Sequence, residues 1–63
     1  MVDLKTRRLL IGMSQTELAE TAGVSLSLVR KIEYGQRKPS VKVAKRIAAV
    51  LCFDWTEFFK EVA

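Results

Sequence analysis

The stretch from Gln15 to Tyr34, QTELAETAGVSLSLVRKIEY, decides the fold of this chain. Apolar residues recur at helical spacing on both sides of Gly23: Leu18, Ala19 and Ala22 precede it, and Val29 and Ile32 follow it. The small side chain of Ala19 lets two helices touch, and Gly23 can take the positive φ that ends a helix at little steric cost. The stretch therefore predicts two short helices joined by a tight turn.

Both helices of this stretch carry start signals. Ser14 and Glu17 form the S-x-x-E pattern of a capping box, and Ser25 is the expected cap of the following helix, which should end at Gly35. At steps of 100° per residue, Val29 and Ile32 lie on the inner side of that second helix. The outward face then consists of Ser27, Lys31 and Tyr34, with Leu26 and Arg30 beside them.

Three further helices are expected outside this stretch, over residues 4–11, from the cap Ser40 to about Leu51, and over about 54–62. Asp54 and Glu57 resemble a second capping box at the start of the last one. We find no strand pattern or internal repeat. The sequence predicts an all-α fold, a compact five-helix domain that spans residues 1–63.

Composition limits the class of protein. The chain has 63 residues, enough for one domain, and its hydrophobic share of 49% argues against a disordered tail. It lacks both an apolar run long enough for a membrane span and the pattern of a signal peptide. A single cysteine gives no internal disulfide. These features lead us to expect a cytoplasmic protein that does not bind membranes.

Positive charge is concentrated in one segment. Residues 30–46 contain seven bases and one acid, a net charge of +6, whereas the rest of the chain carries −2. A basic block of this kind suits a polyanionic partner. An ordinary solvated face would look the same by charge alone, so both interpretations stay open at this point.

Few residues suit chemistry or metal binding. The chain has no histidine and one cysteine, which argues against a zinc site and excludes nucleophiles activated by histidine. It has no glycine-rich phosphate loop either. We expect a protein that is not an enzyme and needs no cofactor or small-molecule ligand. Cys52 is expected to be a small buried apolar residue.

From Leu4 to Ser40 the chain follows the pattern L-x-x-x-R-x-x-x-G-M-S-Q-x-E-L-A-x-x-A-G-V-S-x-S-x-V-x-x-I-E-x-G-x-R-x-P-S. This pattern resembles that of the phage repressor/Cro-like (XRE) helix-turn-helix family. The resemblance extends to about Phe59, and the motif itself covers residues 15–34. It implies a repressor-like DNA-binding domain of five helices, with the helix-turn-helix at the second and third. Such proteins usually bind operator DNA as two-fold dimers and regulate transcription, most often as repressors.

By position, the resemblance assigns roles to individual residues. Arg8 and Glu33 match an ion pair that often ties the first helix to the third. Residues expected to face base edges in the major groove are Ser25, Leu26, Ser27 and Lys31. Those expected along the DNA backbone are Gln15, Arg30, Gln36, Arg37 and Lys38, and we add Lys42 because it starts its helix.

Two positions depart from the family pattern. Cys52 stands where glycine is most common after the fourth helix, and Leu26 stands where polar or basic residues are common. Leucine cannot make the bidentate bonds that arginine makes to guanine, although it can touch a thymine methyl. Lys31 could bind guanine or a phosphate. The base preference therefore stays open.

Apolar side chains gather on the expected last helix. Trp55, Phe59 and Val62 share an arc that so small a domain can hardly bury alone. We expect this patch to form a homodimer, which would place two recognition helices about one turn of DNA apart. The alternative is a protein-interaction module, such as an antitoxin or adaptor, that uses the patch for a different partner.

Overall fold

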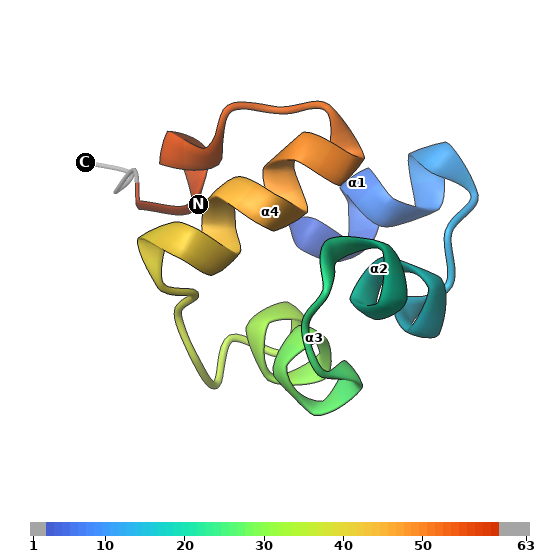
Figure 1. The fold of residues 1–63 in the computed structure, drawn as a ribbon, viewed down its shortest axis with the longest axis horizontal. Helices are drawn as coiled ribbons and strands as arrows, with labels where there is room; N and C mark the ends of the chain where they lie inside the picture. Colours follow the sequence, from blue (N-terminus) through green and yellow to red (C-terminus); the bar gives the residue numbers. More distant parts are fainter. Residues whose placement is uncertain (1–2, 60–63) are drawn as a thin grey trace.

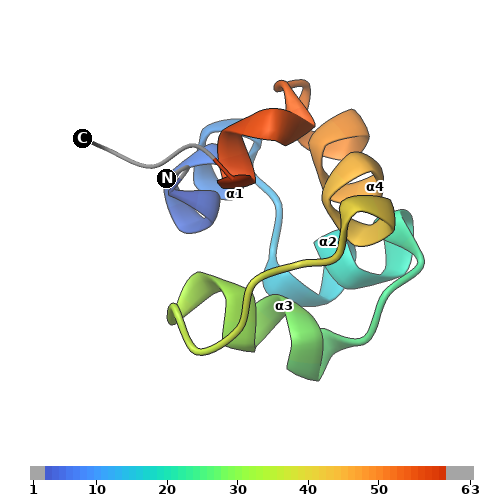
Figure 2. The ribbon, with the colours of Figure 1, turned by 90° about the vertical axis from the view of Figure 1, so that its left-hand side faces the viewer.

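The computed structural model describes residues 3–59, which form α-helices and one short 3₁₀-helix (Figure 1). The elements are α1 (Leu4–Ile11), α2 (Gln15–Ala22), α3 (Leu26–Glu33), α4 (Val41–Leu51) and the 3₁₀-helix η1 (Trp55–Phe59). Two views at right angles place α3 and η1 at opposite ends of the molecule, with α2 and α4 between them (Figures 1 and 2). No helix within residues 3–59 is long and apolar enough to cross a membrane.

Side-chain caps fix the start of each α-helix. Ser14 accepts a hydrogen bond from the backbone N–H of Glu17 at 3.1 Å, and the Glu17 carboxylate accepts one from the N–H of Ser14 at 3.1 Å, so the capping box is complete. Ser25 and Ser40 cap α3 and α4 in the same manner. These bonds satisfy N–H groups that the first turn of a helix leaves without partners.

The core lies where α2 packs against both α3 and α4. Leu18, Val29 and Ile47, one from each of these helices, are completely buried. Ala19 is 4% exposed, and its short side chain suits the close contact of α2 with its neighbours. The core also contains Leu4, Ala22, Ile32, Ala44, Ala48, Leu51 and Phe58. Gly23 has a φ of 71° and ends α2 as the sequence predicts.

The last helix differs from the expectation. A helix with an α-helical capping box was expected over about 54–62; the structure has a 3₁₀-helix over Trp55–Phe59, and residues 60–62 lie outside the described residues. The Asp54 carboxylate accepts hydrogen bonds from the N–H and the hydroxyl of Thr56, two residues on. The Glu57 N–H donates to the Asp54 carbonyl at 3.0 Å, an i→i+3 bond typical of a 3₁₀-helix.

Two smaller expectations were also wrong. Helix α3 ends at Glu33, and Gly35 lies one residue beyond its cap Tyr34, with a φ of 75°. Cys52 is exposed, whereas a buried residue was expected. It caps the C-terminus of α4 in the left-handed conformation (φ 59°, ψ 48°), and a residue at such a cap has already left the face that packs on the core.

Candidate nucleic-acid interface

Helix α3 has one buried face and one exposed face. Val29 is fully buried and Ile32 is 9% exposed, so these two side chains hold α3 against the core. Ser27, Arg30 and Lys31 are exposed on the other side. Ser25 is exposed too, and its hydroxyl oxygen accepts a hydrogen bond from the Leu28 N–H at 3.1 Å. The helix thus presents a hydroxyl and two basic side chains to the solvent from a fixed position.

Leu26 is less exposed than the helical projection indicates. Leu26 and Leu28 are both half-buried and pack against the hydrophobic core. Leu26 was expected to be an exposed apolar residue, either open to solvent or touching a base. The projection treats α3 as an isolated helix and takes no account of neighbouring elements that cover part of its outer face.

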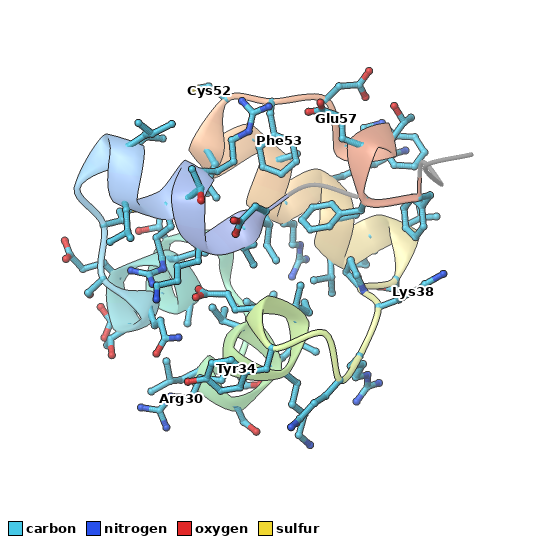
Figure 3. The ribbon with its side chains drawn as sticks, turned by 180° about the vertical axis from the view of Figure 1, so that it is seen from behind. Arg30, Tyr34, Lys38, Cys52, Phe53 and Glu57 are labelled. Atoms are coloured by element: carbon cyan, nitrogen blue, oxygen red, sulfur yellow. The ribbon has the colours of Figure 1, made fainter. Side chains whose placement is uncertain are left out.

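The loop after α3 continues the exposed basic surface. Gln36, Arg37 and Lys38 are all exposed, and the Gln36 N–H donates to the Lys31 carbonyl at 2.9 Å, which holds the loop against the end of α3. Pro39 is buried and ends the loop before α4. Lys42 is exposed in the first turn of α4. Figure 3 shows Lys38 near the start of α4, away from Arg30 on α3 and from Tyr34 at its C-terminal cap.

A buried ion pair joins α1 to α3. Arg8 Nε lies 2.9 Å from Glu33 Oε2 and Arg8 Nη2 lies 3.2 Å from Oε1, so the pair is bidentate. The side chains are only 8% and 2% exposed. Arg8 Nη1 also donates to the Met13 carbonyl at 2.7 Å. A buried charge pair with this geometry fixes orientation as well as contact.

Gln15, the first residue of α2, extends this network. Its Nε2 donates to Glu33 Oε1 at 3.3 Å, and its Oε1 accepts from Arg30 Nε at 3.4 Å. Gln15 was expected along the DNA backbone; its residue is half-buried, and its amide bonds to two residues of α3. Sequence spacing gave no signal for this link, because the partners lie 15 and 18 residues away.

Two bases of α4 make contacts that the sequence analysis missed. Arg46 Nη1 donates to the carbonyl of Gly23 at 3.5 Å, at the turn between α2 and α3. Lys45 Nζ lies 5.1 Å from the centroid of the Trp55 ring, a cation–π contact. A carbonyl at the end of a helix lacks an intrahelical partner and suits a basic side chain, but this rule does not say which base reaches it, and Arg46 lies 23 residues away in the sequence.

The apolar patch at η1 is partly covered. Trp55 is half-buried, and its ring meets that of Phe59 edge-on with centroids 6.0 Å apart. Phe59 is 39% exposed. Val62, the third residue expected in this patch, lies outside the described residues. Phe58 is buried and its ring lies 5.3 Å from that of Phe53.

Comparisons with known proteins agree with this geometry. A family model described as helix-turn-helix matches residues 4–58. The match covers most of the chain, and the protein belongs to the XRE-type helix-turn-helix family. It is 48% identical over 59 residues to YqaF of Bacillus subtilis (strain 168), which is named an uncharacterized HTH-type transcriptional regulator; the alignment covers 94% of this chain and 78% of YqaF. No solved structure matches the chain.

Proposed function

We propose that the protein is a sequence-specific regulator of transcription that binds double-stranded DNA and acts as a repressor. Helix α3 lies in the major groove, where Ser25, Ser27 and Lys31 face base edges. The DNA backbone is bound by Gln15, Arg30, Gln36, Arg37, Lys38 and Lys42. Phosphate contacts supply most of the affinity, and base contacts supply the selectivity.

One observation carries this proposal: the exposed polar and basic side chains of α3 are held in place by buried residues of the same helix, and the loop that follows carries two more exposed bases. Ser27, Arg30 and Lys31 are exposed, while Val29 and Ile32 anchor the same helix to the core. A rigid helix with short polar and basic side chains suits the major groove. Leu26, half-buried, contributes at most its edge to a thymine methyl.

Selectivity also requires a second copy of the chain. One recognition helix reads only a few base pairs, whereas a two-fold dimer reads an inverted repeat with half-sites about 34 Å apart. In this proposal the copies meet through η1, where Phe59 is 39% exposed beside Trp55, together with Val62. Figures 1 and 2 place η1 away from α3, so this contact would leave both recognition helices uncovered.

Selection of bound fragments from random duplex DNA tests the proposal. We expect enrichment of an inverted repeat, and affinity that falls steeply as salt rises. Lys31→Ala should lose about 1–3 kcal/mol of binding free energy, unequally across operator variants, if Lys31 reads a base. An equal loss on every sequence would make Lys31 a phosphate contact. Selection that enriches no sequence at moderate salt would contradict the proposed function.

The exposed ring of Phe59 also favours a second candidate, an interaction module such as an antitoxin or adaptor that binds a different protein through η1. Sedimentation of the purified chain separates the two. A stable homodimer that Phe59→Ser dissociates would mean that a second copy occupies the patch. A monomer at micromolar concentration would favour a different partner.

A further inference from the structure

The orientation of the Gln15 amide is fixed by the chemistry of its two neighbours. The Glu33 carboxylate can only accept hydrogen bonds, and the Arg30 guanidinium can only donate them. Gln15 therefore has one arrangement that satisfies both: Nε2 donates to Glu33 at 3.3 Å while Oε1 accepts from Arg30 at 3.4 Å. The Gln15 amide thus connects the buried Glu33 carboxylate, whose position is fixed, to the Arg30 side chain on the surface.

Arg30 receives this bond at Nε, the atom of the guanidinium nearest its stem. No other hydrogen bond or ion pair within residues 3–59 involves the Arg30 side chain, and the residue is exposed. Its Nη1 and Nη2 groups therefore remain able to bind a phosphate in two parallel bonds. Figure 3 shows Arg30 at the α3 end of the molecule, on the proposed DNA-binding side.

Because the Gln15 amide lies between Glu33 and Arg30, the positive charge of Arg30 is not neutralised by an ion pair with Glu33. Glu33 already forms its bidentate pair with Arg8 at 2.9 and 3.2 Å, so the Glu33 charge is neutralised by α1. An amide carries no net charge, and within residues 3–59 no carboxylate forms an ion pair with Arg30 within 4.0 Å. A long side chain that is already oriented loses less conformational freedom on binding.

We infer that Glu33 and Gln15 are positioning residues for DNA binding, which together hold the Arg30 guanidinium in the orientation that binds a backbone phosphate. This inference rests on the proposed function. Gln15 then contributes through Arg30 as well as through any contact of its own. The buried pair that ties α1 to α3 thereby acts on the strength of DNA binding.

A double-mutant cycle on DNA affinity tests the inference. Gln15→Met keeps a side chain of similar length without the amide, and Arg30→Lys keeps the charge without Nε–H. On a mixed-sequence duplex of about 20 base pairs at low salt, we expect each variant to bind ~3–10-fold more weakly, the effect of one net hydrogen bond. The double variant should bind less weakly than the product of the two single losses predicts, because the link that both changes break is counted in each of them.

Arg37→Lys supplies the matched control. Arg37 is exposed in the loop and makes no hydrogen bond or ion pair within residues 3–59. Its loss should multiply with that of Gln15→Met. If the losses of Arg30→Lys and Gln15→Met also multiply, the inference is wrong while DNA binding itself stands. If the unaltered protein binds no duplex at low salt, the proposed function falls first, and the inference falls with it.

A measurement without DNA tests the link directly. In ¹⁵N-labelled free protein, the Arg30 Nε–H should exchange with water more slowly than that of Arg37, since it is hydrogen-bonded. Gln15→Met should remove this difference, while the helical signal in circular dichroism stays unchanged. Equal exchange rates for Arg30 and Arg37 in the unaltered protein would overturn the inference.

Discussion

Two consecutive arginines on α1, Arg7 and Arg8, form ion pairs with different elements of the fold. One of these pairs is exposed and the other is buried. Arg8 is 7% exposed and pairs with Glu33 at 2.9 Å, which ties α1 to the recognition helix. Arg7 turns the other way: its side chain is 42% exposed, its Nη2 lies 3.6 Å from Glu57 Oε2, and its guanidinium lies 5.4 Å from the centroid of the Phe53 ring. Figure 3 shows Phe53 and Glu57 together at the end away from α3.

Burial decides how much a charge pair contributes to the stability of this fold. Breaking a buried ion pair leaves the remaining charge without a partner and without water. In an exposed ion pair, water readily takes the place of the lost partner. The side of the domain that holds α3 thus combines apolar anchors, Val29 and Ile32, with a buried charge pair. The side that holds η1 depends on apolar contacts, with Phe58 buried beneath Phe53 and the bases Arg7 and Lys45 lying over aromatic rings.

The largest expected effect is that of Arg8→Met. It should lower the free energy of unfolding by about 3–5 kcal/mol, because the Glu33 carboxylate stays buried without its cation. Urea titration followed by circular dichroism measures this loss. The double variant Arg8→Met/Glu33→Met should recover most of it, since neither charge then remains. A loss no greater than that of Arg7→Met would contradict the comparison.

Phe58→Leu should have the next largest effect. Phe58 is 3% exposed and packs on Phe53, so the smaller side chain should cost about 1–3 kcal/mol of unfolding free energy. Phe59→Leu is the control, because Phe59 is 39% exposed and should lose less than about 1 kcal/mol. Similar losses for the two variants would mean that η1 is not anchored by Phe58.

Cys52→Gly should stabilise the protein. A left-handed conformation costs a non-glycine residue about 1–2 kcal/mol, and the extra freedom of glycine in the unfolded chain offsets about half of this. We expect a gain of about 0.5–1 kcal/mol, seen as a higher Tm. Gly12→Ala should show a similar loss, since Gly12 has a φ of 77° and open space around it. A lower Tm for Cys52→Gly would contradict the strain at this cap.

Arg7→Met should have the smallest effect, at most about 0.5 kcal/mol, because exposed ion pairs contribute little. Methionine keeps the apolar stem of the side chain, so packing on Phe53 is largely retained. The difference from the unaltered protein should shrink further when urea titrations are repeated at high salt. A loss that persists at high salt would mean that the cation–π contact with Phe53 matters more than the pair with Glu57.

Local signals predicted most of the fold. Serine caps, apolar stripes and the glycines at helix ends lie within a few residues of the boundaries that they set, and α1, α2 and α4 occupy the expected residues. Cys52 was misjudged because its residue type was given more weight than its place at a helix end. The 3₁₀ form of η1 lies in backbone hydrogen bonds such as that from the Glu57 N–H to the Asp54 carbonyl, which a capping pattern in the sequence does not specify.

The candidate site was less predictable than the fold. Exposure of Ser27, Lys31 and the basic loop follows from helical periodicity and from the charge pattern. The link from Glu33 through Gln15 to Arg30, and the bond from Arg46 to the Gly23 carbonyl, depend on how whole helices pack. Periodicity describes which way a side chain points from its own helix. These bonds also depend on how two helices lie relative to each other.

The exposed thiol of Cys52 has a practical consequence for experiments on this protein. Cys52 is the single cysteine of the chain, and Figure 3 shows it at the end of the molecule opposite Arg30 and Tyr34. A maleimide dye would therefore attach at one known position, remote from the recognition helix. Fluorescence anisotropy of such a conjugate can follow the titrations described above without an added tag.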